Sequence, residues 1–146
     1  MTDQDAEAGG RPGAPLHVPP PCDLTLGLAC SDRSTPGRTT WVLRADERFA
    51  NPVGTVQGGF LAALCDSAMG ASSVTWARHR GLRVTVANVE LKCSFLKPAR
   101  LGSTLTCTAW VLGGGSRTCF VEADVVDDEE RLVAKSSSTY LLSRRD

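Results

Sequence analysis

Asp66 is the side chain of this sequence best placed to do chemistry, because it stands in a long apolar run. From Phe60 to Ala77 almost all residues apart from Asp66 are apolar or small, which predicts a helix without a wide polar face. We interpret such a helix as buried. An ionised carboxylate there is costly unless it is paired, hydrogen-bonded or used in a reaction. An Asp that is merely satisfied within the core is the alternative interpretation.

Two glycines at the start of the predicted helix favour the reactive interpretation. The N–H groups of Gly58 and Gly59 lie at the positive helix end, where they can hold an oxyanion or a polarised carbonyl. One buried helix therefore carries both a carboxylate and backbone N–H groups that can stabilise an electrophile. Together they indicate a reaction site.

The spacing of these groups predicts that the site is shared between two chains. Gly58 and Asp66 are eight positions apart, which is roughly 12 Å along a helix at about 1.5 Å per residue. One helix therefore cannot bring both groups to the same carbonyl. Two antiparallel copies could do so, with Gly58 of one chain facing Asp66 of the other.

Strand patterns on both sides must position this helix, which we place from about Gln57 to His79. Alternating apolar residues predict a first hairpin with strands over 23–31 and 38–45. Further strands are predicted over 83–96, 103–112, 116–126 and 132–142. We interpret Gly113–Gly115 as a hairpin loop, because it lacks the spacing of a phosphate-binding loop. A sheet of five or six strands can bury one helix only by curving around it, which predicts an α+β fold with one central helix.

Length and composition narrow the classes of function. The 146 residues suffice for one domain with its own core. A formal net charge of zero argues against nucleic acid or an anionic membrane as the main partner. The longest apolar run contains Asp66 and several hydroxyl residues, so it makes a poor membrane span. Residues 1–21 are rich in Pro and Gly, and we expect a disordered or loosely packed tail there, followed by one domain over 22–146.

The cysteines and histidines add two further expectations. None of the six cysteines forms a CxxC pair, and the acidic start of the chain lacks the positive region of a secretory signal. We therefore expect reduced thiols in a cytoplasmic protein. Only His17, in the tail, and His79, at the polar end of the helix, could serve a Ser-His-Asp triad or a histidine-based zinc site, so we predict neither.

The segment from Asn51 to Asp66 resembles the N-x-x-G-x-x-H-G-G-(x)6-D signature of PaaI-like hotdog-fold acyl-CoA thioesterases. Residues 88–102 are similar to the family segment that leads to F-x-x-P-A-x-x-G, and the resemblance covers about residues 23–143. It implies the hotdog fold, a homodimer with antiparallel central helices, and a pairing of dimers into a homotetramer. The implied reaction is the hydrolysis of acyl-CoA or acyl-carrier-protein thioesters. No cofactor is implied, because coenzyme A is part of the substrate.

The resemblance also implies roles for single residues. Asp66 corresponds to the catalytic carboxylate, which activates water or attacks the thioester itself. The Gly58 N–H would polarise the thioester carbonyl. Asn51 would hold the water or the carbonyl, and Asn88 would orient Asp66 or the water. The residues implied in coenzyme A contacts are Ser116, Arg117, Lys97 and Arg100.

One position departs from the family pattern. Gln57 stands where the family usually has His, and Gln can exchange hydrogen bonds but cannot titrate near neutral pH. We expect this position to act by orientation. Three alternatives stay open: a non-catalytic hotdog protein that binds acyl-CoA, a hotdog dehydratase, for which the usual His is missing, and a purely structural domain. The acyl group of the substrate is not given by the sequence.

Overall fold

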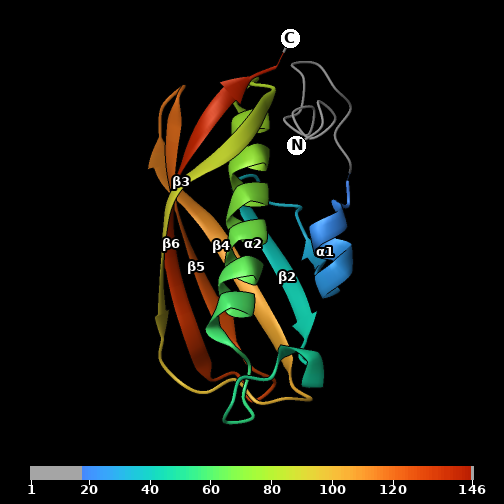
Figure 1. Ribbon diagram of the computed structural model, residues 1–146. Coiled ribbons are helices and arrows are strands. Elements are labelled where there is room, and N and C mark those ends of the chain that lie inside the picture. The colour runs from blue at the N-terminus through green and yellow to red at the C-terminus, as the bar shows by residue number, and fades with distance from the viewer. Residues whose placement is uncertain (1–17, 146) are drawn as a thin grey trace, which may run out of the picture.

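A long helix lying along one face of a six-stranded sheet forms the framework of the protein. The structure, a computed structural model, describes residues 18–145. Helix α2 (Gly58–His79) runs along the concave side of the sheet, which curves around it (Figure 1). The strand order is β1-β2-β4-β5-β6-β3, and every neighbouring pair is antiparallel. The predicted α+β architecture with one central helix is confirmed.

The strand boundaries lie close to the predicted ones over most of the chain. The strands are β1 (Ala29–Asp32), β2 (Arg38–Arg44), β3 (Val84–Phe95), β4 (Thr104–Gly114), β5 (Thr118–Val126) and β6 (Leu132–Arg144). The β1–β2 hairpin and the glycine-containing β4–β5 hairpin are both present. A short 3-10 helix, η2 (Glu47–Phe49), precedes α2.

The strand predicted over 23–31 is wrong in its first half. Residues Pro21–Leu26 form a short helix, α1, and only Ala29–Asp32 enter the sheet. Pro21 suits the first position of a helix because its missing N–H would have no helical partner there. Gly27 ends the helix with a φ of 70°, a left-handed conformation that glycine adopts readily. The predicted tail lies outside the described residues except for 18–21.

The core lies between α2 and the concave face of the sheet. On β5 the buried and half-exposed residues alternate, as expected for a strand with one covered face. The buried residues of α2 that pack toward the sheet include Leu61, Leu64, Cys65, Ala68 and Met69. This packing holds the helix at a fixed position relative to β3 and β6, the strands that matter for the site.

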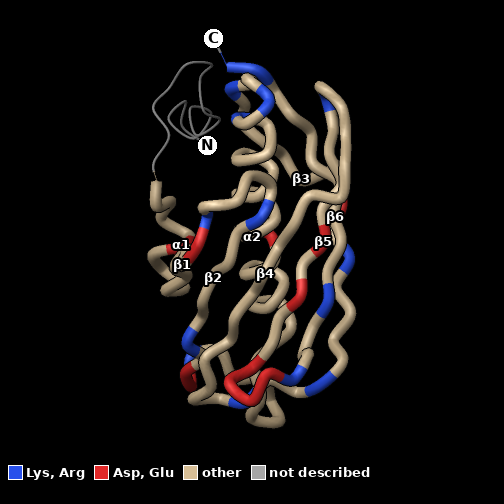
Figure 2. The backbone as a smooth tube through the Cα atoms, turned by 180° about the vertical axis from the view of Figure 1, so that it is seen from behind, with Lys and Arg blue, Asp and Glu red and all other residues tan. Residues whose placement is uncertain are grey.

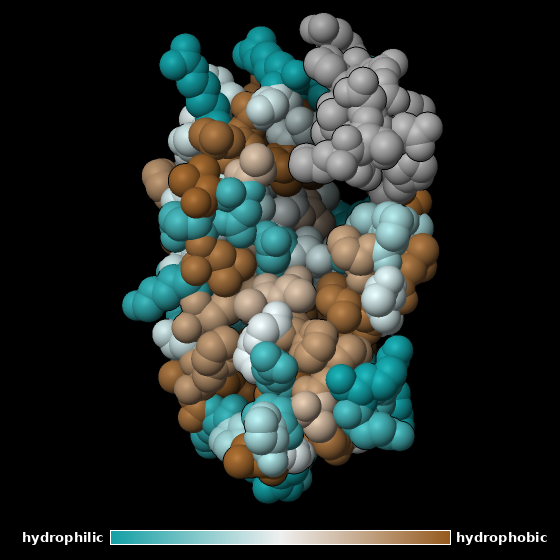
Figure 3. All heavy atoms as spheres, in the orientation of Figure 1, coloured by the Kyte–Doolittle hydropathy of each residue, from teal (hydrophilic) through white to brown (hydrophobic). Residues whose placement is uncertain are grey.

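Among the described residues, 18–145, nothing covers the opposite face of α2. Small residues there are half-exposed, among them Ala63, Gly70 and Val74, and Asp66 is exposed. Figure 3 shows tan and brown atoms over the lower part of this face. Within the described part of the chain α2 is therefore buried on one side only, and the expected burial of its other side would need a second chain.

The two edge strands of the sheet are very different in length. β1 has 4 residues, whereas β3 has 12 and pairs only with β6 among the described strands. A long unpaired edge offers a row of N–H and C=O groups to another strand. The β3 edge and the uncovered face of α2 are thus the two surfaces of residues 18–145 that most need a partner.

Charged residues are dispersed along the backbone of the described chain. In Figure 2, Lys and Arg are interspersed with Asp and Glu over the strands, and acidic residues gather at the β5–β6 turn. Within residues 18–145 no helix has the length and apolar character needed to cross a membrane.

Candidate active site

The carboxylate of Asp66 is held by hydrogen bonds from two different strands. Asn88 Nδ2 of β3 donates to Asp66 Oδ1 at 2.9 Å, and the Tyr140 hydroxyl of β6 donates to the same oxygen at 2.5 Å. The Tyr140 hydroxyl also lies 3.0 Å from the main-chain carbonyl oxygen of Asp66. Among residues 18–145 no donor reaches Asp66 Oδ2. One oxygen is anchored, and the other is available on the open face of α2.

A buried serine fixes the orientation of the Asn88 amide. Ser138 Oγ lies 2.9 Å from Asn88 Oδ1 and 2.6 Å from the Glu90 carbonyl oxygen. Its single proton can serve one of these acceptors at a time. Because the ionised carboxylate of Asp66 can only accept, Asn88 turns its Nδ2 toward it and its Oδ1 toward the Ser138 hydroxyl. Asn88 thus donates to Asp66, and its predicted role of orienting this carboxylate stays a prediction.

The pairing of β3 with β6 brings these groups together. Asn88 lies opposite Tyr140, and Leu91 lies opposite Ser138, with a bulge between Asn88 and Glu90. A bulge adds one residue to one strand and changes the direction of neighbouring side chains. Here Asn88 and Tyr140 both reach Asp66 on α2, and Ser138 contacts Asn88.

The surroundings of Tyr140 favour the protonated phenol, which can donate a hydrogen bond. Burial raises the pKa of Tyr140 well above its ordinary value, and the hydrogen bond to Asp66 and its negative charge raise it further. The side chain is only 2% exposed. A phenol in this environment keeps its proton, so it stabilises the ionised form of Asp66.

A groove lies at the N-terminal end of α2. It has a volume of about 420 Å³, and its lining includes Asn51, Gly58, Phe95 and Lys97. No acceptor among the described residues receives the N–H of Gly58 or Gly59. A Cβ atom at Gly58 would lie 2.8 Å from the Phe95 ring, so the close approach of the ring favours glycine there. The groove therefore presents bare N–H groups beside an aromatic wall.

Asn51 lies in the loop before α2, where its side chain bonds to the loop itself, and Gln57 lies at the N-cap of the helix. Asn51 Oδ1 accepts from the N–H groups of Val53 and Thr55, and its Nδ2 donates to Thr55 Oγ1. Asn51 thus shapes the loop before α2, with one amide hydrogen left over. Gln57 is exposed at the N-cap of α2, and its side chain makes no capping hydrogen bond.

The predicted coenzyme A contacts divide between the two ends of the molecule. Lys97 lines the groove, and the exposed Arg100 lies on the same β3–β4 connection. Ser116 and Arg117 are exposed in the β4–β5 hairpin, beside the C-terminal end of α2, where Arg80 donates to the Gly115 carbonyl at 3.1 Å. A single chain does not bring the two pairs together.

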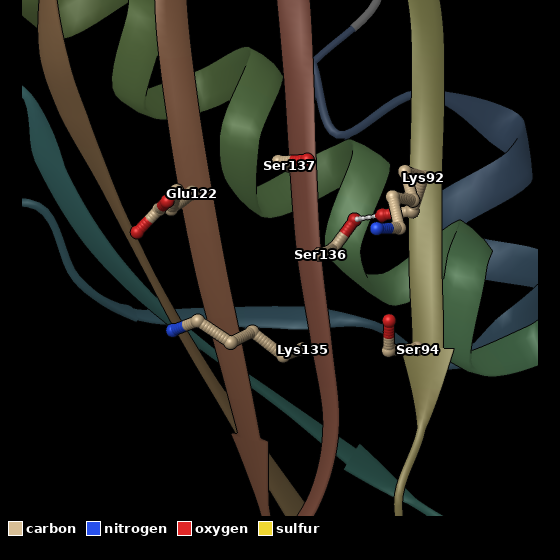
Figure 4. Close-up of a pocket in the computed structure, with 6 residues that line it drawn as sticks. All are labelled: Lys92, Ser94, Glu122, Lys135, Ser136 and Ser137. Atoms are coloured by element: carbon tan, nitrogen blue, oxygen red, sulfur yellow. Dashed lines mark hydrogen bonds between the residues drawn. The ribbon is translucent and has the colours of Figure 1, made fainter.

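A second hollow lies on the outer side of the sheet. Figure 4 shows the side chains around it, from β3, β5 and β6; they are Lys92, Ser94, Glu122, Lys135, Ser136 and Ser137. Lys135 pairs with Asp124 at 2.7 Å on this side. The sheet separates this hollow from Asp66. Within residues 18–145 no group of three or more His, Cys, Asp or Glu side chains could hold a metal ion.

Our sequence analysis missed Ser138, Tyr140 and Phe95. Polar residues at every second position of the last strand, Ser136, Ser138 and Tyr140, could have indicated an inward-facing polar cluster. Phe95 gave a weaker signal, since an apolar residue at the end of a strand is more often part of the core.

Residues 53–134 match the family model of the thioesterase superfamily. The chain belongs to this superfamily. Human acyl-coenzyme A thioesterase 13 is 26% identical to this thioesterase over 118 residues, which are 80% of this chain and 81% of the relative. A mutant of the phenylacetic acid degradation protein PaaI from Thermus thermophilus is 26% identical, with a TM-score of 0.74 over 84% of this chain and 98% of its own.

One further structural neighbour of this thioesterase was solved with a ligand. The protein smu.793 from Streptococcus mutans, bound to acetyl CoA, has a TM-score of 0.72, 22% identity, and coverage of 82% of this chain and 91% of its own. At that identity the likeness concerns the fold. The comparisons confirm that the chain is a PaaI-like hotdog thioesterase and a thioester hydrolase.

Proposed function

We propose that this thioesterase hydrolyses acyl-CoA thioesters, with Asp66 of one chain and the Gly58 N–H of its partner acting on the same substrate. The observation that carries the proposal is the state of Asp66: its Oδ1 is anchored twice, and its Oδ2 is free on the uncovered face of α2. The acyl-CoA thioesterase among the relatives supports this substrate class.

A homodimer would complete the site. Gly58 and Asp66 of one chain are roughly 12 Å apart along α2, too far to act on one carbonyl. The small residues on the open face of α2 would allow two helices to approach closely, and the long β3 edge could pair with its copy. Antiparallel helices would place Gly58 of one chain near Asp66 of the other. A pairing of such dimers into a tetramer is part of the same proposal.

The reaction can follow either of two routes from this arrangement. In the first, Asp66 Oδ2 takes a proton from water as the water oxygen attacks the thioester carbon, and the Gly58 N–H stabilises the developing oxyanion. The C–S bond then breaks, and the leaving thiolate takes the proton from Asp66. In the second, Oδ2 attacks the carbon itself, the thiolate leaves and is protonated by solvent, and water opens the resulting anhydride. Both routes yield a free acid and a thiol.

The remaining predicted residues would handle the rest of the substrate. Lys97 and Arg100 lie near the groove and could meet the phosphates of coenzyme A, as could Ser116 and Arg117 of the partner, whose hairpin would approach from the other end. Asn51 would act through the loop that it shapes, and Gln57 through hydrogen bonding at the helix start. An acyl carrier protein would present the same thioester and pantetheine arm, and is the second substrate form that we propose.

The test is a hydrolysis screen of purified protein with short aliphatic, long aliphatic and aryl acyl-CoA esters. We expect turnover of at least one class, and its loss in Asp66→Asn. Tight binding of acyl-CoA without turnover would contradict the proposal and favour the acyl-CoA-binding alternative.

A further inference from the structure

We propose that Tyr140 is a positioning residue of this reaction, whose hydroxyl holds Asp66 Oδ1 so that Oδ2 alone faces the substrate. The proposal rests on the function proposed above for Asp66. It concerns a residue that the sequence motif does not contain, since Tyr140 lies 74 positions after Asp66.

The two oxygens of the Asp66 carboxylate differ in their hydrogen bonds, because both donors bond to Oδ1. A carboxylate with one donor can still swing about that hydrogen bond, whereas donors from two directions restrain its plane. Asn88 approaches Oδ1 from β3 at 2.9 Å, and Tyr140 approaches it from β6 at 2.5 Å. Hydrogen bonds to a charged acceptor are the stronger kind. Oδ2, with no donor among the described residues, is left to react.

Tyr140 is suited to this task by its rigidity. Its ring is buried and lies beside Gly70, one turn after Asp66 on the same helix. Its hydroxyl also reaches the main-chain carbonyl oxygen of Asp66 at 3.0 Å. The single phenolic proton lies between the side chain and the backbone of one residue. The hydroxyl therefore holds the carboxylate at a fixed position relative to the backbone of α2.

Few other titratable groups face this carboxylate. From β6 the neighbour is Tyr140, and from β3 it is Cys93, whose thiol pKa is raised by Cys65 of α2, by burial and by the charge of Asp66. From α1, Asp23 accepts a hydrogen bond from Ser67, the residue after Asp66. The phenol and the thiols keep their protons in the acid range.

The first test is Tyr140→Phe, which removes the hydroxyl and keeps the ring. Loss of one hydrogen bond to a charged group predicts a fall in kcat of roughly ten- to a hundredfold, with KM unchanged within about twofold. Ser73→Ala is the matched control. It removes a buried hydroxyl that donates to the Met69 carbonyl of the same helix and does not touch Asp66.

The second test needs no change in packing, because Tyr140 is the single tyrosine of the chain. Protein grown with 3-fluorotyrosine carries one fluorine label, at the proposed hydrogen bond. We expect the fluorine NMR signal of this label to shift in Asp66→Asn, which changes the acceptor of the hydrogen bond. It should stay in place in Asp23→Asn, because Asp23 bonds to Ser67 and not to Tyr140.

The outcomes separate the two proposals. Suppose that the wild type turns over a thioester. The role of Tyr140 alone would then be overturned if kcat in Tyr140→Phe were within twofold of wild type, or if the fluorine signal were the same in Asp66→Asn. No turnover of any thioester by the wild type would overturn both proposals, whatever the fluorine signal does. A fall in kcat at constant KM, with a fluorine signal that shifts in Asp66→Asn, supports the role of Tyr140.

Discussion

Replacing Asp66 with Asn separates the chemistry of the site from its architecture. The amide oxygen of Asn can still accept the hydrogen bonds from Asn88 and Tyr140, so the positions of both donors should be kept. What is lost is the negative charge and the reactive oxygen Oδ2. A general base or nucleophile contributes a factor of about 100 or more, so we expect turnover to fall by at least about two orders of magnitude.

The same substitution should affect folding only slightly. Asp66 is exposed in the chain, and charge-assisted hydrogen bonds become neutral ones without losing their partners. We expect the free energy of unfolding to change by less than about 1 kcal/mol. For a domain of this size that corresponds to a shift in melting temperature of about 3 °C or less.

The assay should follow the thioester itself or quantify free coenzyme A by chromatography. Thiol-specific reagents would also react with Cys22, which is exposed. Asp124→Asn is the matched control, because Asp124 is also a hydrogen-bonded carboxylate but lies on the outer side of the sheet, paired with Lys135. Turnover by Asp66→Asn within tenfold of wild type would refute a chemical role of this carboxylate, and equal losses in both variants would point to a general effect of charge.

Three further predictions concern the fold. Leu64→Ala, at a fully buried position of α2, should lower the free energy of unfolding by about 2–5 kcal/mol in a denaturant titration. The control Leu112→Ala, at a position of β4 that is 60% exposed, should change it by no more than about 0.5 kcal/mol. Gly114→Ala should lower the melting temperature, because its Cβ would lie 2.6 Å from Cys119 Cα, while Gly113→Ala, with no atom within 4 Å, should have a small effect; equal effects would contradict this hairpin geometry. Burial raises the pKa of Asp127, but hydrogen bonds from Arg131 and the Glu129 N–H outweigh it and hold the pKa below its ordinary value of 3.8. Because the folded-state pKa is depressed, Asp127 stabilises the protein above that pH, so Asp127→Asn should be less stable than wild type at neutral pH, and the difference should shrink as the pH falls below about 4; a difference independent of pH would contradict this.

The central helix was predictable because its signals are local. The apolar run around Asp66 and the glycines at its start lie within one stretch of chain, and Gly81 follows the helix directly. Helix α2 accordingly begins and ends within a residue of its predicted bounds. The later strands alternate cleanly, which is why their boundaries also agree.

The first half of the strand predicted over 23–31 failed because alternation is a weak signal over a short segment. Leu24 and Leu26 follow the period of a strand, yet Pro21 and Gly27 set the two ends of a one-turn helix, and Leu24 is 67% exposed. Local backbone preferences here outweighed the apolar pattern.

The anchoring of Asp66 depends on contacts that no local pattern contains. Tyr140 and Asn88 are separated by 52 positions, and they meet because β3 pairs with β6 across a bulge. The register of such a pair depends on the whole sheet. The exposure of Asp66 has a similar origin, since the sequence indicates an apolar helix but not which of its faces another chain must cover.

Mixing two inactive variants tests most directly whether the site is shared between chains. In a heterodimer of Asp66→Asn and Gly58→Pro, one site would collect both lesions and the other would collect none. Proline is tolerated at the first position of a helix, although the Phe95 ring near Gly58 must shift to admit it. Random exchange between two variants of a symmetric dimer makes about half of the dimers heterodimers, so roughly a quarter of wild-type activity should return. No recovery, when exchange and folding of both variants have been demonstrated, would contradict the shared site and would place both groups in the site of one chain.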